Sequence, residues 1–578
     1  MSLSEPSGPA GFFEHSNWGG NLTLDAQEVL PRLQPAAIAA ALRRLPEEEL
    51  AIALRSKIVP MVTLPGLRLY AAFGTAAKES ARDGGLRLIA EGTSGDFLAA
   101  SREAVGSSLV RTATFDLSRR FPRHSAMNRF SDTQVVILLF ALLCAVFAGA
   151  VSPAGMMPLA LGLAGGLVFL AIIALRILSL MPMPRRAAAG PPPPLADDDL
   201  PLYTVLVPLF RETSVLRQLL HGLTSLDYPD HKLDIKLILE ENDILMQRAV
   251  FGLRLPDHFD IIVVPSGLPQ TKPRALNYAL QFARGELVTI FDAEDIPEPN
   301  QLRAAAAAFA TYSEETACLQ AGLTFYNPNE NWLTRQFTVE YASLFGVLLP
   351  ALSAHNLPFP LGGTSNHFRS AILKRVGAWD PFNVTEDADL GLRLARAGYE
   401  TAVLPSITYE EANTRLWNWM RQRSRWLKGF LQTWLVHMRN PARFFAEVGP
   451  AGFWVSQTMT LGVFLSTLLH PFGLAVVAWP MLNGFGTTDT GPVAVALAGL
   501  NLLVLLAGYG VSMAAGVVGL RRLRMSGWWF TILTMPVYWL LMSVAAWMAL
   551  WQFVVAPSYW NKTHHGLSVH RRRKPTPS

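Results

Sequence analysis

The stretch that decides the fold is Leu287-Val288-Thr289-Ile290-Phe291-Asp292-Ala293-Glu294-Asp295, a largely apolar strand followed directly by acids. Three more short apolar strands precede it, separated by helical patterns: strands Tyr203–Pro208, Ile235–Leu239 and Ile261–Val264, and helices Thr213–Leu226 and Pro273–Ala283. This alternation predicts a doubly wound, mostly parallel sheet. Ligands of such sheets bind at the carboxyl ends of the strands, so we expect Asp292 at a ligand site.

The acids after this strand are candidate metal ligands. Mg²⁺ and Mn²⁺ prefer hard oxygen ligands, commonly one or two carboxylates together with phosphate oxygens. Asp292 and Glu294 are the predicted ligands, and Asp295 is a further candidate. The alternative interpretation is a solvated acidic turn that ends the strand.

Two short strings follow downstream. Thr385-Glu386-Asp387 comes just before a helical pattern at Leu390–Ala397, and Gln422-Arg423-Ser424-Arg425-Trp426 lies on a Trp-rich helix. Helical spacing places Gln422, Arg425 and Trp426 on one face. Taken alone, the first string also fits a helix N-cap, and the second fits an interfacial helix anchored in lipid headgroups.

In this order, and between apolar runs, the three strings resemble the membrane-embedded family-2 glycosyltransferases, in particular the bacterial cellulose-synthase-like β-glycan synthases. The resemblance covers about residues 202–566 and implies a GT-A domain that transfers sugar from a nucleotide diphosphate. The family pattern D-x-D is here D-x-E, formed by Asp292 and Glu294.

The resemblance also implies residue roles. Asp387, beside Glu386 and Thr385, is the general base, and attack opposite the leaving group inverts the anomeric carbon. The implied donor and diphosphate ligands are Gln422, Arg425, Lys272, Glu240, Glu241 and Asp292, with Arg274 as a neighbour of Lys272. The implied acceptor contacts are Trp426, Gly363 and Thr364. We expect His367 and Asp389 to be structural residues.

Composition indicates a chain that is part soluble and part membrane-embedded. Of its 578 residues, 51% are hydrophobic and only 16% charged. The net charge of +5 does not suggest nucleic acid as a partner, and two cysteines exclude a disulfide framework. The predicted order is a transmembrane hairpin at 133–182, a linker at 183–201, the GT-A domain at 202–440 and a transmembrane region at 441–556.

The basic residues just beyond the apolar runs predict which side of the membrane they face. Arg185-Arg186, Arg521–Arg524 and Arg571–Lys574 indicate cytoplasmic loops, and Arg176 is near enough to the end of its run to snorkel. The resulting expectation is a multi-pass protein of the bacterial inner membrane with a cytoplasmic catalytic domain. Since the 28 residues of Trp528–Val555 precede a basic tail, we expect a kinked hairpin around Pro536.

The ends of the chain give weaker signals. Residues 1–25 lack an apolar stretch, so we expect a disordered segment without a signal peptide. Residues 26–125 read as a small α/β module with helical patterns at Pro35–Leu54 and Gly95–Val110. The module faintly resembles the N-terminal domain of type II secretion ATPases, which implies a cyclic-di-GMP or protein partner as one reading and a stability role as the other. In the tail at 557–578, Tyr559–Gly566 is similar to the segment that closes over the donor in cellulose-synthase-like enzymes.

The expected function is processive synthesis of a β-glucan from UDP-glucose, with the growing polysaccharide as acceptor, Mg²⁺ or Mn²⁺ as cofactor, and translocation through the membrane. Two alternatives remain. One is a non-processive enzyme that glycosylates a membrane lipid, as ceramide glucosyltransferases do. The other is an export or signalling component with an inactive transferase fold, which the intact Asp387, Gln422, Arg425 and Trp426 argue against.

Overall fold

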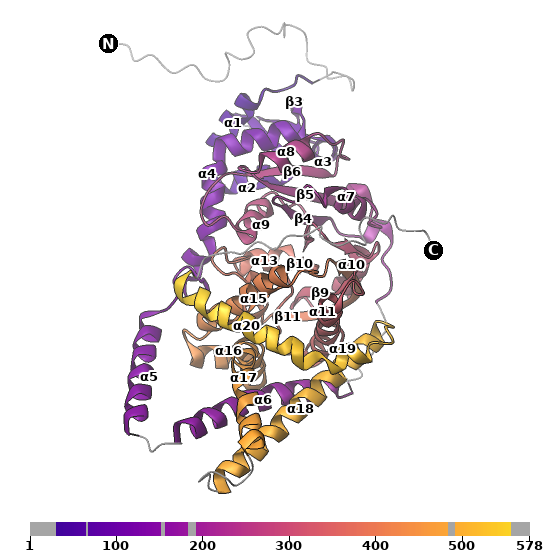
Figure 1. Cartoon of the computed structure of the whole chain (residues 1–578). Coiled ribbons are helices and arrows are strands. Elements are labelled where there is room, and N and C mark those ends of the chain that lie inside the picture. The colour runs from indigo at the N-terminus through magenta and orange to yellow at the C-terminus, as the bar shows by residue number, and fades with distance from the viewer. Residues whose placement is uncertain (1–29, 65–66, 152–155, 183–191, 484–491, 557–578) are drawn as a thin grey trace, which may run out of the picture.

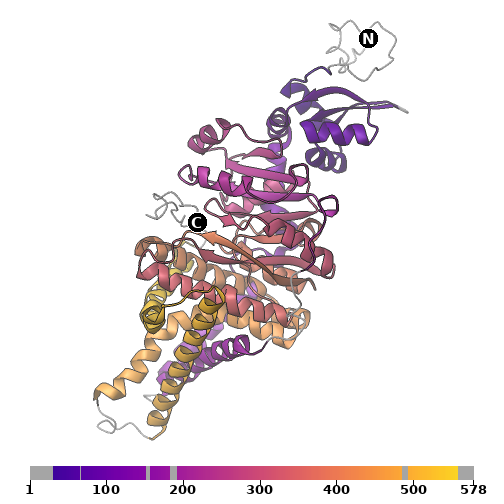
Figure 2. The ribbon, with the colours of Figure 1, turned by 90° about the vertical axis from the view of Figure 1, so that its right-hand side faces the viewer.

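The computed structural model describes residues 30–64, 67–151, 156–182, 192–483 and 492–556 (Figure 1). The predicted segments at 1–25 and 557–578, including Tyr559–Gly566, lie outside these ranges. Three layers are stacked along one direction: an N-terminal module, a catalytic sheet with its helices, and a bundle of apolar helices (Figure 2).

The N-terminal module is a small α/β unit, as expected. Its elements are α1 (Pro35–Arg44), α2 (Glu47–Ser56), β1 (Ile58–Leu64), β2 (Leu67–Phe73), α3 (Thr75–Asp83), β3 (Leu88–Gly92) and α4 (Ser94–Arg120). The sheet order is β1-β2-β3, antiparallel and then parallel. A capping box between Thr93 and Asp96 starts α4, which runs ten residues beyond the predicted Val110 and packs against the catalytic layer.

The catalytic sheet has eight strands in the order β6-β5-β4-β7-β10-β9-β11-β8. The strands are β4 (Tyr203–Leu209), β5 (Leu233–Glu240), β6 (Phe259–Val264), β7 (Leu287–Ile290), β8 (Ile296–Pro297), β9 (Thr316–Phe325), β10 (Asn366–Arg369) and β11 (Glu400–Glu410). Only β10 and β8 run antiparallel to their neighbours. The mostly parallel α/β fold class is therefore confirmed.

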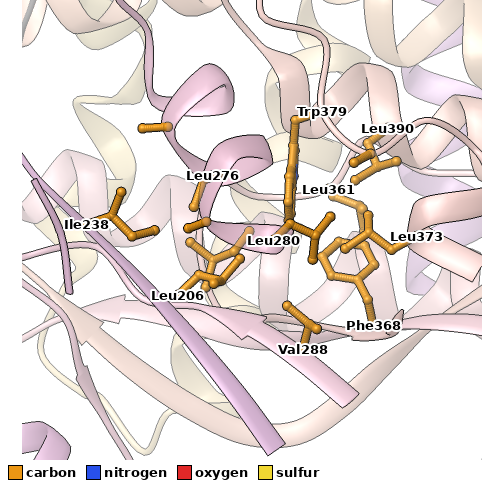
Figure 3. Close-up of a cluster of buried hydrophobic side chains, with 14 of the residues drawn as sticks. Leu206, Ile238, Leu276, Leu280, Val288, Leu361, Phe368, Leu373, Trp379 and Leu390 are labelled. Atoms are coloured by element: carbon orange, nitrogen blue, oxygen red, sulfur yellow. The ribbon is translucent and has the colours of Figure 1, made fainter. Parts of the chain in front are cut away.

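Helices cover the sheet and meet it in a large apolar core. They are α7 (Leu216–Thr224), α8 (Ile244–Phe251), α9 (Lys272–Leu280), α10 (Gln301–Thr311), α13 (Ser370–Arg375) and α14 (Glu386–Arg396). Leu206 and Val288 of the sheet face Leu276 and Leu280 of α9, and the cluster continues to Trp379 (Figure 3). This core fixes the ends of β7 and α9, where the acids and Lys272 emerge.

The third layer consists of apolar helices, all of them long except the short α19: α5 (Asp132–Val151), α6 (Met156–Leu180), α16 (Pro441–Gln457), α17 (Val463–Asn483), α18 (Pro492–Arg522), α19 (Trp529–Leu533) and α20 (Met535–Val555). Within the described residues, four helical stretches are long and apolar enough to cross a membrane: Trp332–Ala354, Pro441–Ala475, Gly499–Arg522 and Met535–Val555. The first comprises α11 (Trp332–Ser343), a π-helical turn and α12 (Leu349–Ala354), and the sequence analysis did not predict it as a span.

The expected hairpin around Pro536 is wrong. The chain breaks at Thr534 after α19 and continues as the single helix α20, in which Pro536 occupies the first turn. Proline is tolerated there because the first backbone N–H groups of a helix have no partner within it. Helix α20 packs against α15 (Leu416–His437) and α17 (Figure 1).

Candidate active site

Thr385-Glu386-Asp387 lies at the start of α14 and is held there by α15. The backbone N–H of Thr385 donates to Asn383 Oδ1 (3.1 Å), and the Asn383 amide donates to the Thr433 hydroxyl (2.9 Å). The Gln432 amide donates to the carbonyl of Phe382 (3.0 Å). Gly429 makes the close approach possible, because a Cβ there would overlap the Thr385 side chain.

Asp387 faces the loop around Gly363, which connects α12 to β10. One carboxylate oxygen accepts from the backbone N–H of Ala388 (2.7 Å), and the other lies 3.2 Å from where a Cβ on Gly363 would be. Burial raises the pKa of Asp387, and burial beside Asp387 raises the pKa of Glu386 to about 7. The two adjacent carboxyls therefore hold protons more tightly than exposed acids.

Lys272, the first residue of α9, joins the acidic strand end to the glycine loop. Its Nζ lies 2.5 Å from Asp292 Oδ1 and 2.8 Å from the carbonyl oxygen of Gly363. Burial lowers the pKa of Lys272, but the nearby carboxylates, with Asp292 the strongest, outweigh it and raise the pKa above its usual value.

Asp295 is not placed as a metal ligand. It is buried, and its carboxylate accepts from the backbone N–H of Asp292 (2.6 Å) and from the Thr364 hydroxyl. Thr364 also bonds the carbonyl of Ile290 (3.1 Å), so its hydroxyl ties the loop to the end of β7. Glu294 stays with Asp292 on the wall of the cavity described below.

The Q-x-x-R-W residues lie on α15 and face the same acids. Arg425 is half-buried and interacts electrostatically with Glu386, Asp387, Asp292 and Glu294; desolvation lowers its pKa. Gln422 accepts from the Asn413 amide (2.7 Å).

Trp426 belongs to an aromatic group with α11. Its ring stacks against Tyr341, with centroids 6.5 Å apart and planes at 26°, and meets Phe337 edge-on. The Arg423 guanidinium lies 4.6 Å from the Trp426 ring centroid.

Arg423, which helical spacing does not place on the face of Gln422, Arg425 and Trp426, is a structural residue of the site. It is buried and forms a bidentate ion pair with Glu340 (2.6 and 2.7 Å) and a hydrogen bond to the Tyr538 hydroxyl (3.1 Å). It thus joins α15 to α11 and α20. No local pattern indicates this, because its partners lie 83 and 115 residues away.

The two residues of the predicted pair Glu240-Glu241 lie in different places. Glu240 ends β5, lines the cavity and accepts from Arg274 (2.8 Å) and Gln270 (3.2 Å). Arg274 is fully buried in this ion pair, so its interpretation as a diphosphate contact is wrong. Glu241 accepts from the backbone N–H of Ser266 (2.9 Å) and lines a separate shallow pocket beside α4.

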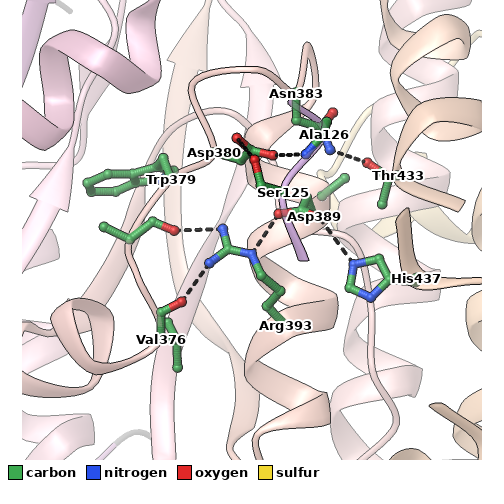
Figure 4. Close-up of polar contacts among 12 residues, drawn as sticks. Ser125, Ala126, Val376, Trp379, Asp380, Asn383, Asp389, Arg393, Thr433 and His437 are labelled. Atoms are coloured by element: carbon green, nitrogen blue, oxygen red, sulfur yellow. Dashed lines mark hydrogen bonds and ion pairs between the residues drawn. The ribbon is translucent and has the colours of Figure 1, made fainter. Parts of the chain in front are cut away.

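Asp389 and His367 have structural partners, as expected. Asp389 bonds Arg393 (2.7 Å) and His437 (3.2 Å), beneath the loop where Asp380 accepts from the backbone N–H of Ala126 (Figure 4). His367 is buried between the Tyr203 hydroxyl (2.7 Å) and Gln301 (3.3 Å).

These residues share a cavity of about 530 Å³. Its walls include the predicted site residues other than Glu241, Asp295 and Arg274: Thr385, Glu386, Asp387, Gln422, Arg425, Trp426, Lys272, Glu240, Asp292, Glu294, Gly363 and Thr364. The cavity continues between the apolar helices, where α6, α17, α18 and α20 contribute residues such as His470 and Tyr509. The catalytic and membrane layers therefore enclose one space.

The carboxylate oxygens of the site fit a divalent cation whose coordination is completed mainly by the phosphate oxygens of a bound ligand. Four carboxylates, Asp292, Glu294, Glu386 and Asp387, face the two cations Lys272 and Arg425, which leaves a formal excess of negative charge. In the described part of the chain, no three His, Cys, Asp or Glu side chains form a preformed metal cluster. A site with one or two carboxylates completed by phosphate oxygens has this character.

Residues 201–429 match the family described as "Glycosyltransferase like family 2", so this part of the chain is a family-2 glycosyltransferase domain. Together with the four apolar helices, it fits a membrane-embedded protein.

The chain is similar to the probable glycosyltransferase YdaM of Bacillus subtilis (25% identity, covering 40% of this chain and 56% of that one). It is also similar to cellulose synthase 2 of Novacetimonas hansenii (29%, 42% and 15%) and to a β-monoglucosyldiacylglycerol synthase of Nostoc (24%, 56% and 66%). It thus spans less than two thirds of the length of each. A solved mannosyltransferase from Pyrobaculum calidifontis, in complex with GDP-Man and Mn²⁺, aligns at 18% identity with a TM-score of 0.46, over 69% of this chain and 98% of that one.

Proposed function

We propose that the chain is an inverting glycosyltransferase that moves a hexose from a UDP-sugar, in the first place UDP-glucose, onto an acceptor held in the cavity. The observation that carries the proposal is that Asp387 and the helices α17, α18 and α20 line the same space. An acceptor that receives sugar at Asp387 thereby has a path between the apolar helices.

The site residues divide the chemistry among them. Lys272, Arg425 and Gln422 would hold the donor diphosphate, and Trp426 would stack on the acceptor sugar. Asp387 takes the proton from the acceptor hydroxyl while that oxygen bonds to the anomeric carbon and the bond to the diphosphate breaks, releasing UDP. Mg²⁺ or Mn²⁺ on Asp292 and Glu294 would supply charge neutralisation for the diphosphate.

We place the product as a β-glucan made processively and translocated across the bacterial inner membrane, with the catalytic layer in the cytoplasm. The basic residues Arg521 and Arg522 at the end of α18, and Arg524 just beyond it, support this orientation. The N-terminal module would then meet cytoplasmic partners, a protein or cyclic-di-GMP.

The second candidate is a glycolipid synthase. Leu344, Leu348 and Val504 are among the apolar side chains on the membrane side of the cavity, and relatives named β-monoglucosyldiacylglycerol synthase favour it.

The test is incubation of the purified protein with Mg²⁺ and labelled UDP-glucose, with Asp387→Asn as control. Ethanol-insoluble label that β-glucanase releases and that requires Asp387 supports the polymer synthase. Label that partitions into the organic phase supports the lipid product and overturns the polymer.

A further inference from the structure

The membrane side of the cavity contains a charged side chain that the proposed chemistry does not use. Arg176 of α6 lines the cavity, and its snorkelling to the membrane interface stays a prediction. Among the described residues, no ion pair or hydrogen bond to its guanidinium is present; only its backbone carbonyl is engaged, by the Ser179 hydroxyl (2.7 Å). A charge within a membrane-spanning layer is costly and marks a functional site.

No carboxylate of the residues that the structure describes pairs directly with this charge. Glu340 acts on Arg176 electrostatically, but its two oxygens are occupied by Arg423 (2.6 and 2.7 Å) and by the Tyr538 hydroxyl (2.6 Å). The positive charge therefore remains available to a ligand in the cavity.

A second polar group lines the membrane side of the same cavity. His470 is 5% exposed; its Nε2 bonds the Tyr509 hydroxyl (2.6 Å), while its Nδ1 is buried without a partner. Ile173, three residues before Arg176, packs on Gly508, where a Cβ would lie 3.6 Å away, and Tyr509 follows directly. Both groups therefore adjoin the contact between α6 and α18.

The character of this wall favours a polar ligand over an acyl chain. The Tyr509 and Trp539 rings lie 4.8 Å apart beside His470, and Ser466, Thr467 and Ser512 also line the cavity. Aromatic faces with nearby hydroxyl and imidazole groups suit sugar rings, which present both C–H and O–H groups.

We propose that the ligand held in this half of the cavity carries an oxyanion, a carboxylate or a phosphate, that pairs with Arg176, while His470 hydrogen-bonds the adjoining unit. A planar guanidinium binds both oxyanions in a bidentate manner. The proposal rests on the proposed transfer reaction but departs from the neutral β-glucan as its product, because it makes the acceptor an acidic glycan. A lipid phosphate has the same chemistry and forms the second arm of the test.

Binding to the full-length protein in neutral-lipid nanodiscs, without donor, tests the proposal. The probes are a glucuronate-containing β-linked oligosaccharide against a neutral β-glucan oligosaccharide of equal length, and dioctanoyl phosphatidic acid against dioctanoylglycerol. We expect the acidic oligosaccharide to bind about tenfold more tightly than the neutral one. Arg176→Met should remove the preference, Arg176→Lys should keep part of it, and Arg521→Met, outside the cavity, should leave it unchanged.

If only phosphatidic acid, and not the acidic oligosaccharide, shows an Arg176-dependent preference, the oxyanion belongs to a lipid headgroup. That result supports the proposed oxyanion site. Equal binding of acidic and neutral probes of both kinds, or a preference that survives in Arg176→Met, overturns it. If Arg176→Met does not fold, the ratio of acidic-probe to neutral-probe affinity in Arg176→Lys, compared with that ratio in the unaltered protein, still tests the proposal. Because no turnover is measured, failure here is separate from failure of transfer, which Asp387→Asn reports.

Discussion

Lys272 holds the carboxylate of Asp292, with Nζ 2.5 Å from Oδ1, at the point where a divalent cation is expected to bind. This ion pair joins the first turn of α9 to the end of β7. A cation on Asp292 must share the carboxylate with the ammonium group, so cation binding and the position of Lys272 are coupled.

Lys272→Met should therefore raise the affinity of the donor-free protein for Mn²⁺ while weakening binding of the UDP-sugar, since the same ammonium competes with the cation and attracts the diphosphate. Mn²⁺ titration by electron paramagnetic resonance and donor titration by calorimetry measure the two effects. Asp292→Asn is the control and should lower Mn²⁺ affinity. A fall in Mn²⁺ affinity in Lys272→Met would contradict the assignment.

Asp387→Asn should lower the rate of transfer about 10²–10⁴-fold, because the amide cannot take the acceptor proton. UDP-sugar binding should change little, since Lys272 and Arg425 remain. Asp389→Asn, two residues along α14, is the matched comparison. It disturbs the Arg393 and His437 contacts, so it should lower Tm more than it changes the rate per folded molecule. Equal losses of rate in both variants would remove Asp387 from the chemistry.

The rate should rise with pH through an apparent pKa well above the usual carboxyl range, because Asp387 must be ionised and the coupled pair titrates late. The pKa of Glu386 is raised to about 7, so the folded state favours the protonated carboxyl. Its contribution to the free energy of unfolding is therefore fully present below the pKa that Glu386 has in the unfolded chain, and it is lost as pH rises through about 7. Glu386→Gln should shift the acid limb of the rate profile to lower pH and flatten the fall in Tm. An unchanged profile would assign the limb to another group.

Gly429→Ala should reduce both activity and stability. The added methyl group overlaps Thr385 and pushes the start of α14 away from α15; overpacking of this kind costs about 1–3 kcal/mol. Gly510→Ala in α18, where a Cβ meets nothing within 4 Å, is the control. Thermal unfolding in detergent and the transfer rate are the measurements. A Gly429→Ala protein with unaltered rate would show that Thr385 tolerates displacement.

Lys57→Met should loosen the N-terminal module from the catalytic layer. Lys57 Nζ lies 2.6 Å from the buried carboxylate of Asp260, which Lys236 also contacts at 2.6 Å. Removing one partner of a buried ion pair costs about 3–5 kcal/mol of stability. Because Lys236 still pairs with Asp260 in the variant, we expect a loss near the lower value of that range. The more exposed pair Lys78–Glu91 is the comparison, and Lys78→Met should cost at most about 1 kcal/mol. Thermal unfolding and limited proteolysis measure both, and equal Tm shifts would contradict the expectation.

Local patterns in the sequence were sufficient for much of the architecture. Apolar strands between helices predicted the parallel part of the sheet, and the acids after Ile290 predicted where a site lies, because strand and helix periodicity are properties of neighbouring residues. The strings around Asp387 and Arg425 indicated two groups of site residues. In the structure both groups line one cavity.

Contacts between distant segments decided the rest. Arg274 pairs with Glu240, and Arg423 pairs with Glu340. The carboxylate of Asp295 accepts from the backbone N–H of Asp292 in its own turn. Each buried charge requires a partner, and the fold brings that partner near. The span Trp332–Ala354 and the uninterrupted helix after Pro536 likewise depend on packing. Local patterns thus indicate which chemical groups the protein carries and which elements bear them. Which of those groups face the shared cavity follows only from the folded structure, because it depends on long-range packing and charge compensation.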